Sequence, residues 1–262
     1  PNKARLTAVL RHELPDRVPN FEVLVDNPTL RYVMGREVAG GSTYDNIDPR
    51  DYIEFAGRIG QDAIGMNFVD TPFRRVDEQG KLCALQFRIQ SSSDLERVTV
   101  VGPEILDSRF ALLDRYVQAL EGTDIGLFVT MADFLTDVYT ETFGFENFMY
   151  MLEDDRDLVE EVLEIHVNFQ VALAKRVLEY PLTFFYPADD LAYKTGTLVQ
   201  PDLLREIWVP RMSRVFAPAL AKHIPIVFHS DGNIQELIPD LIDMGINVLN
   251  PLEPYGMDIR EI

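Results

Sequence analysis

The chain has 262 residues, of which 47% are hydrophobic, and its 24 Lys and Arg against 43 Asp and Glu give a formal net charge of -19. A chain of this length buries roughly three quarters of its unfolded surface, which predicts one domain, residues 1–262, around one core. The negative charge repels phosphate backbones and anionic lipid, and excludes nucleic acid and membrane surfaces as partners. A lone cysteine, Cys83, allows no internal disulfide, and no apolar run reaches the roughly 20 residues of a membrane span. We therefore expect a soluble, cytoplasmic protein.

Six short runs are apolar on both faces, which is typical of buried parallel strands. In chain order they are residues 20–25, 63–68, 125–130, 182–186, 225–228 and 246–249. Helical stretches separate them, and the clearest has apolar residues at three- and four-residue steps over 155–178. Another begins at Pro201, with Pro210 and Pro218 predicting a kink or break. The alternation of strands and helices predicts an α/β fold with a parallel sheet.

Residues 73–89 interrupt this alternation. Two strand-like runs flank Glu78-Gln79-Gly80-Lys81, and Gly80 can supply the positive φ that a tight turn needs. The pattern predicts a β-hairpin inserted after the second strand, where it could form part of a pocket wall.

The architecture that we expect is a TIM-type (β/α)8 barrel, which needs eight strand-helix units. About six units are visible in the chain. We therefore expect a barrel domain that lacks its C-terminal strands, with an open sheet as the alternative.

Polar residues follow the last three predicted strands directly. They are Asp189 and Asp190, then His229, Ser230 and Asp231, and then Asn250 and Glu253. Because the carboxyl ends of parallel strands open onto one face, these side chains are expected to converge. The sequence thus predicts one acidic pocket that contains a histidine.

Several of these residues have two interpretations. His229 and Asp231 lie on one side of an extended segment, a spacing that suits a shared metal ion, although the histidine could brace a loop and the aspartate could cap a helix. Adjacent carboxylates repel, so either Asp189 or Asp190 could have a raised pKa and act as an acid, but only one can face the pocket. Two prolines hold Glu253 in a stiff loop, which suits a ligand.

Residues outside this group are weaker candidates. Tyr193 could donate a hydrogen bond to a substrate. Asp70 closes the second strand and could receive a donor, the alternative being an ion pair with Arg74 or Arg75. The Phe- and Met-rich stretch 131–151 is typical of core packing, with the floor of a flat-ligand pocket as the alternative. The sequence contains no Gly-rich phosphate loop, Cys-x-x-Cys pair or nucleophile elbow.

A set of motifs runs through the whole chain. They are Pro15-Asp16-Arg17-Val18-Pro19, Phe143-Gly144-Phe145-Glu146-Asn147-Phe148-Met149, Ala188-Asp189-Asp190-Leu191, Val227-Phe228-His229-Ser230-Asp231-Gly232-Asn233 and Leu249-Asn250-Pro251-Leu252-Glu253-Pro254. Together they resemble the uroporphyrinogen decarboxylase superfamily. That superfamily contains cofactor-free decarboxylases of porphyrin biosynthesis and corrinoid-linked methyltransferases that use zinc.

The two branches differ at positions that can be compared here. The decarboxylases have an arginine-rich stretch after the first strand that meets substrate carboxylates, whereas this chain has Phe21-Glu22-Val23-Leu24-Val25-Asp26. Phe68-Val69-Asp70 resembles their Phe-x-Asp, whose aspartate faces the pyrrole nitrogens. The methyltransferases have His-x-Cys where this chain has His229-Ser230-Asp231, so the histidine is kept and aspartate replaces cysteine. The resemblance is therefore closer to the methyltransferase branch.

The resemblance implies a methyltransferase that moves a methyl group from a small donor, such as a methyl ether, to a corrinoid protein. Uroporphyrinogen decarboxylase and a non-catalytic ligand-binding barrel are the alternatives. The expected partners are the methyl donor or a tetrapyrrole, the corrinoid protein and a second copy of the chain in a homodimer. The expected roles are zinc binding by His229 and Asp231, catalysis by Asp70, Asp190 and Glu253, and substrate binding by Asp189, Tyr193 and Asn250.

Overall fold

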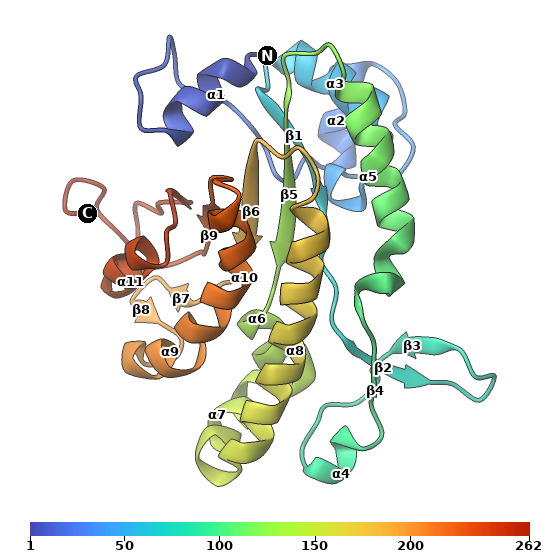
Figure 1. The fold of residues 1–262 in the computed structure, drawn as a ribbon, viewed down its shortest axis with the longest axis vertical. Coiled ribbons are helices and arrows are strands. Elements are labelled where there is room, and N and C mark those ends of the chain that lie inside the picture. Colours follow the sequence, from blue (N-terminus) through green and yellow to red (C-terminus); the bar gives the residue numbers. More distant parts are fainter.

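The computed structural model describes residues 1–262 apart from the side chains of Tyr44 and Ala132. Its centre is a parallel sheet in which the described strands follow the order β1-β5-β6-β9-β10 (Figure 1). The strands are β1 (Ala63–Asn67), β5 (Gly126–Ala132), β6 (Phe184–Ala188), β9 (Val227–His229) and β10 (Val248–Asn250). Helices connect successive strands of this sheet. The predicted α/β fold class is confirmed, and five of the predicted strands are present within about two residues of their expected positions.

Helices α5, α8 and α10 lie along the strands on one side of the sheet (Figure 1). The α-helices are α1 (Lys3–Leu10), α2 (Asn27–Met34), α3 (Pro49–Ile59), α4 (Ser92–Leu95), α5 (Asp107–Leu120), α6 (Leu135–Asp137), α7 (Phe145–Asp154), α8 (Arg156–Val177), α9 (Pro201–Ile207), α10 (Val209–Ala221) and α11 (Ile238–Asp243). Short 3-10 turns are η1 (Thr43–Asp45), η2 (Pro103–Leu106) and η4 (Gln235–Leu237), and η3 (Val138–Thr142) is a π-helix. No helix in the described part of the chain is both long and apolar enough to cross a bilayer.

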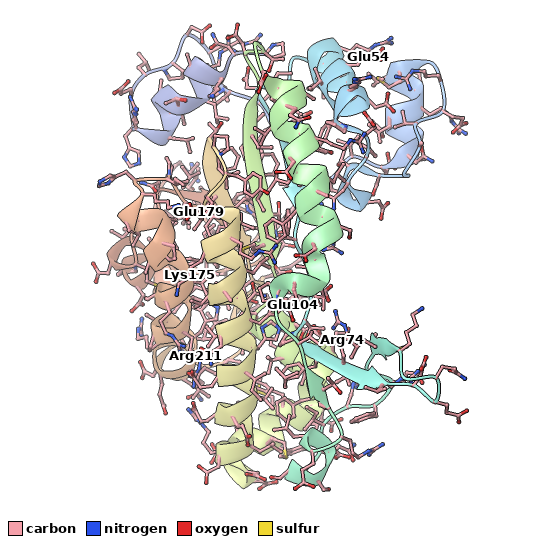
Figure 2. All side chains as sticks on the ribbon, turned by 45° about the vertical axis from the view of Figure 1, so that its right-hand side comes forward. Glu54, Arg74, Glu104, Lys175, Glu179 and Arg211 are labelled. Atoms are coloured by element: carbon pink, nitrogen blue, oxygen red, sulfur yellow. The ribbon has the colours of Figure 1, made fainter. Side chains whose placement is uncertain are left out.

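Helix α8 begins and ends as the sequence predicts. The Asp155 side chain accepts a hydrogen bond from the Leu158 amide at 3.2 Å, which caps the helix start, and Lys175 and Arg176 lie in the last turn, where cations are favoured. Arg211 of α10 forms ion pairs with glutamates of α8 and joins the two helices (Figure 2). The sheet is therefore covered by helices that are themselves tied together.

The predicted break after Pro201 is confirmed. Helix α9 ends at Ile207 and α10 begins at Val209, with Pro210 in its first turn, where the missing N–H of proline costs nothing. Pro218 lies inside α10 instead of breaking it.

The predicted hairpin is also confirmed. Strands β2 (Phe73–Val76) and β3 (Leu82–Ala84) pair antiparallel, and Gly80 has a φ of 79° in the turn. A third strand, β4 (Thr99–Val100), pairs with the other side of β2. The β2–β3 hairpin projects away from the body of the molecule (Figure 1). Two further strands, β7 (Ala192–Tyr193) and β8 (Gly196–Thr197), form a small separate pair.

The prediction of a strand at residues 20–25 is wrong. The segment belongs to no strand, and side chains and isolated backbone groups of Asp62 and Thr43 bond its backbone in place of a strand neighbour. Asp62 accepts from the Asn20 amide at 3.0 Å, and Thr43 accepts from the Val25 amide at 2.7 Å. Gln61 donates to the Glu22 carbonyl at 3.2 Å. Apolar composition predicted an extended segment, but it could not reveal these side-chain partners.

The alternation of side chains along the strands divides the core in two. One set of strand residues packs with the helices, and the other set faces the opposite side and forms a smaller cluster that includes Phe128, Phe184 and Tyr186. The Phe128 and Phe184 rings stack with centroids 4.9 Å apart, and the Phe21 ring packs on both. Gly65 leaves space for this stack, because a Cβ there would lie 2.3 Å from the Phe128 ring. This inner face carries the candidate site at the carboxyl ends of its strands.

Candidate functional site

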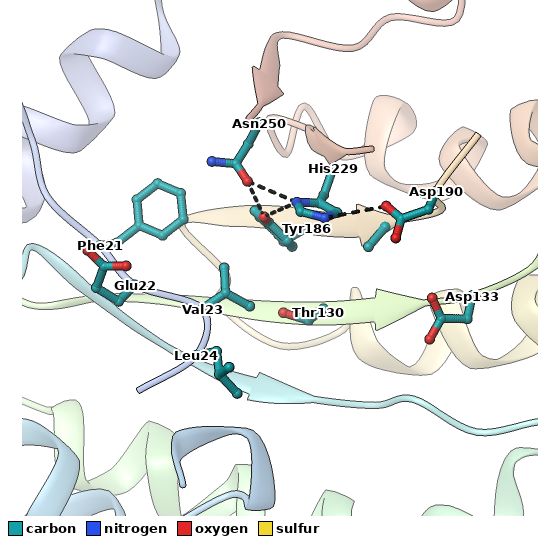
Figure 3. A pocket seen from close by; sticks show the side chains of 11 residues that line it. Phe21, Glu22, Val23, Leu24, Thr130, Asp133, Tyr186, Asp190, His229 and Asn250 are labelled. Atoms are coloured by element: carbon teal, nitrogen blue, oxygen red, sulfur yellow. Dashed lines mark hydrogen bonds and ion pairs between the residues drawn. The ribbon is translucent and has the colours of Figure 1, made fainter. Parts of the chain in front are cut away.

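A cavity of about 580 Å³ opens on the inner face of the sheet, at the carboxyl ends of the strands (Figure 3). Its polar lining consists of Glu22, Thr130, Asp133, Asp190, His229 and Asn250. Its other lining residues are Phe21, Val23, Leu24, Tyr186 and Ala188. Successive strand ends therefore supply chemically active side chains to one hollow, with the extended segment 20–25 as the facing wall. The projecting hairpin contributes no residue to this described lining, contrary to the expectation that it could form part of the wall.

The imidazole of His229 is held from one side by two residues. Its Nδ1 lies 3.0 Å from Asn250 Oδ1 and 3.1 Å from the Tyr186 hydroxyl, which itself donates to Asn250 Oδ1 at 2.6 Å (Figure 3). An amide oxygen can only accept, so Nδ1 carries the proton that it donates to Asn250. The Nε2 atom lies on the other side of the ring, away from this contact.

Two carboxylates lie beside that nitrogen. His229 Nε2 is 3.6 Å from Asp190 Oδ1 and 3.7 Å from Asp231 Oδ1, and the three candidate ligand atoms lie within 4.8 Å of one another. Ligand bonds of about 2.1 Å in a tetrahedral zinc site place neighbouring ligand atoms roughly 3.4 Å apart, so these separations suit one shared cation. Burial raises the pKa of Asp231, and the negative charges of Asp190 and Glu253 add to the rise. A cation would offset this repulsion.

Asp190 is positioned by the segment that follows β5. Its amide donates to Thr136 Oγ1 at 3.0 Å, and its carbonyl accepts from the Tyr139 hydroxyl at 2.5 Å. Its carboxylate also accepts from the Asp231 amide at 3.0 Å. The two carboxylates of the cluster are therefore linked through the backbone as well as through His229.

The neighbouring carboxylate of Asp189 is fully buried and points the other way. It accepts hydrogen bonds from the Leu135 amide, from the amide and hydroxyl of Thr136 and from Trp208 Nε1, at 2.7 to 2.9 Å. Burial raises the pKa of Asp189, while these hydrogen bonds oppose the rise. The Asp189 oxygen atoms are enclosed and already bonded, so the structure does not support the predicted substrate binding by Asp189. Its role is to fasten the end of β6 to α6 and α9–α10.

Comparison with known proteins identifies the family. The family model described as "Uroporphyrinogen decarboxylase (URO-D)" matches residues 88–253, which is more than half of the chain. The chain belongs to the uroporphyrinogen decarboxylase family. A search of curated protein sequences gave no match. Among solved structures, a methyltransferase from Methanosarcina mazei is similar with a TM-score of 0.61 and 20% identity, over 94% of this chain and 74% of that one. At this identity the likeness establishes the shared fold.

Of the predicted site residues of this URO-D family member, Asp190, His229 and Asn250 line the cavity, and two others lie away from both the lining and the cluster around His229. Asp70 is ion-paired with Arg74 of the hairpin strand β2, which is the alternative that the sequence left open. Tyr193 is 60% exposed, in the β7–β8 pair. The structure therefore does not bring either side chain to the cluster around His229, and their catalytic and binding roles are not supported.

Glu253 supports the loop that carries Asp231. Its carboxylate accepts from the Gly232 amide at 2.8 Å. Gly232 has a φ of 83°, and a Cβ there would lie 2.5 Å from the backbone of Ala192, so this loop needs glycine. Asn250 lines the cavity and contacts His229, as described above. A catalytic role for Glu253 and substrate binding by Asn250 stay predictions.

Asp133 is a cavity residue that the sequence analysis missed. It follows β5 and has a φ of 71°, uncommon for a residue other than glycine, and its amide donates to the Ala188 carbonyl at 2.9 Å. Burial, with the negative charges of Asp189, Asp190 and Asp137, raises its pKa to about 7. The signal was present, since Asp133 follows a predicted strand as Asp189 and Asp190 do.

The stretch around Asp133 contributes one further residue to the lining and several rings to the core. Thr130, on β5, is buried, and its hydroxyl has no hydrogen-bond partner among the residues that the structure describes. Phe134, Phe143 and Phe148 are fully buried in the larger core. The core interpretation of the Phe- and Met-rich stretch is therefore confirmed for these rings.

Proposed function

We propose that the chain is a methyltransferase that moves a methyl group from a small donor, such as a methyl ether, to a corrinoid carried by a separate protein. The observation that carries the proposal is the cluster of His229, Asp190 and Asp231 at a cavity of small-molecule size. Membership of the uroporphyrinogen decarboxylase family and the fold shared with a methyltransferase support it.

The cluster has the donor set and spacing for a zinc ion. His229 Nε2, Asp190 and Asp231 would hold the metal, and Asn250 with Tyr186 would fix the imidazole in the tautomer that metal binding requires. When bound, zinc supplies Lewis acidity that stabilises negative charge developing on the oxygen of the departing group. The repulsion between Asp190 and Asp231 gives these residues an electrostatic preference for a divalent cation over an empty site.

The remaining lining residues suit the organic part of the donor. Phe21, Val23 and Leu24 form an apolar wall opposite the strand ends, which would hold a hydrocarbon or aromatic group by its burial. This arrangement would direct the ether oxygen toward the polar side of the cavity. The acidic surroundings favour an uncharged donor over an anionic one.

Uroporphyrinogen decarboxylation is less well supported by the same cavity. The described lining contains no arginine or lysine that could pair with substrate carboxylates, and it presents Glu22, Asp133 and Asp190 to them. Asp70, the residue expected to be central to that reaction, is paired with Arg74 away from the lining. Production of coproporphyrinogen by the purified chain would reverse this preference.

The direct test is methyl transfer in vitro. The zinc-loaded protein is mixed with reduced cobalamin and a panel of alkyl and aryl methyl ethers, and methylcobalamin is followed by its visible spectrum. Transfer is expected with the wild type and with the control variant His223→Asn. His223 is exposed, and its φ of 55° is one that asparagine also adopts. Transfer is expected to be lost with His229→Ala. No transfer from any ether, with the metal bound, would contradict the proposal.

A further inference from the structure

We infer that Asp133 is the acid that gives a proton to the leaving oxygen of the methyl donor. This inference rests on the methyl transfer proposed above and assigns a catalytic residue within it. A methyl ether is a poor donor because its oxygen departs as an alkoxide or phenoxide unless a proton or a cation meets the developing charge. A protonated group on the polar side of the cavity would meet this charge beside the proposed zinc ion.

The position of Asp133 meets this need. It lines the same cavity as His229 and Asp190, and it lies at the end of β5 beside Asp190 at the end of β6 (Figure 3). Its backbone is held by the hydrogen bond to the Ala188 carbonyl in a left-handed conformation that few side chains adopt. Such conformations occur at functional sites, where the surrounding structure maintains them.

Asp133 differs in its contacts from two neighbouring carboxylates, those of Asp190 and Glu253. Asp190 accepts the Asp231 amide, and Glu253 accepts the Gly232 amide, so both act as acceptors in the loop framework. Among the hydrogen bonds of the described residues, Asp133 takes part only through its backbone amide, which donates to the Ala188 carbonyl. Its carboxyl group is therefore free to contact a ligand. Thr130 Oγ1, buried and unpartnered among the described residues, lines the cavity from the same strand and offers a second donor to a substrate oxygen.

The surroundings of Asp133 keep its proton in place near neutral pH. Burial is the largest cause of its raised pKa of about 7, and nearby negative charges add to it. The charged and titratable groups around it are Asp137 on α6, Tyr139 in η3, Tyr186 on β6, Asp189 and Asp190 after β6, His229 at the end of β9 and Glu22 in the facing wall. A bound cation would weaken the repulsion from Asp190, but the effect of burial would persist. A carboxylic acid in this range can both donate and regain a proton during turnover.

The step balances without a further reactant. The electron pair of Co(I) in the corrinoid forms a bond to the methyl carbon, and the carbon–oxygen bond breaks with its pair going to oxygen. That oxygen takes the proton of the Asp133 carboxyl and leaves as an alcohol or phenol. Cobalt is formally oxidised to Co(III) as the methyl carbon accepts its electron pair. Asp133 becomes a carboxylate and regains a proton from water.

The test compares wild type and Asp133→Asn on a series of ring-substituted anisoles of similar size. Asparagine keeps the shape of the side chain and cannot supply an acidic proton. The variant is expected to lose about 10²- to 10⁴-fold in rate with unactivated ethers and much less with a nitro-substituted anisole, whose phenolate leaves without a proton. Asp202→Asn, a change at a side chain that is 96% exposed, is the matched control.

The outcomes separate the two claims. Equal dependence on the leaving group in wild type and Asp133→Asn would overturn the role of Asp133 while methyl transfer stands. No transfer by the wild type from any anisole would overturn both claims. If the variant fails to fold, the wild-type pH profile decides: a rate that falls as pH rises through about 7 supports the inference, and a profile without that fall overturns it.

Discussion

The two ends of the sheet's inner face differ sharply although the same strands form them. Toward the amino ends, Phe128 and Phe184 stack in full burial against Phe21. Two residues further along, β5 carries Thr130 and β6 carries Tyr186. Beyond the carboxyl ends of the same strands, Asp133 and Asp190 belong to the polar lining of the cavity. Two residues of a strand span only about 7 Å. The apolar layer of this face should therefore contribute mainly to stability, and the adjacent polar layer mainly to activity. Substitutions in one layer should affect one property more than the other.

The largest expected effect is at the polar end. His229→Ala should lower methyl transfer by about 10²- to 10⁴-fold, because it removes both a metal ligand and the group that organises Asp190 and Asp231. Its unfolding free energy should fall less than that of a variant in the apolar stack, since the His229 side chain is 28% exposed and the Phe184 side chain is fully buried. Chemical denaturation and the cobalamin assay, run beside His223→Asn, measure the two effects. If the loss in unfolding free energy accounted for the whole loss of activity, the two layers would not be independent.

The apolar end should show the reverse. Phe184→Ala removes a fully buried ring from the stack and should lower the unfolding free energy by about 3–5 kcal/mol. The folded fraction should still bind zinc with wild-type affinity, because the ring does not belong to the cluster. Tyr32→Ala, at a side chain that is 88% exposed, is the control and should change stability little. Weakened zinc binding in the folded Phe184→Ala protein would show that the layers are coupled.

A smaller effect is expected where the two layers meet. Tyr186→Phe keeps the ring in the inner cluster and removes the hydroxyl that bonds Asn250 and His229. Zinc affinity should fall by about 10- to 100-fold, as is typical for the partners that orient a metal-binding histidine. Calorimetric titration with zinc measures this change. Tyr180→Phe removes a hydroxyl that bonds Asp114 away from the cavity and should leave the affinity unchanged, so an equal loss in both variants would refute the assigned contact.

The smallest expected effect concerns the pH dependence of stability. The pKa of Asp133 is about 7 in the folded chain against an ordinary value of 3.8, so the folded state binds more protons between these two pH values. Its contribution is therefore favourable at low pH and is lost as pH rises from about 4 through about 7. The Asp133→Asn variant does not titrate at this position and should melt several degrees higher than wild type at pH 8. The gain should vanish near pH 4, and a gain that is constant with pH would exclude titration as its cause.

Much of the fold was predictable because it depends on local patterns. The apolar runs of β5, β6 and β9, the capped and amphipathic helix α8, and the Gly80 turn each have a signature within a few residues. Residues 20–25 have the same apolar signature, yet partners distant in the sequence, Asp62 and Thr43, satisfy their backbone. Such long-range contacts leave no local pattern.

The candidate site was predictable where topology alone decides it. Residues after strand ends converge, which anticipated the neighbourhood of Asp190, His229 and Asp231. The direction of each side chain depends on packing, so the sequence could not tell that Asp189 would be enclosed by Thr136 and Trp208. The same limit applies to Asp70, whose partner Arg74 lies on the hairpin.

Zinc titration of the metal-free wild-type chain against Asp231→Asn tests most directly whether the strand ends form a cation site. Wild type should bind one zinc ion per chain, and Asp231→Asn should bind it far more weakly while keeping its fold, because one of the proposed ligands is then neutral. Absence of zinc binding by the folded wild type, or equal affinity in the two proteins, would contradict the account.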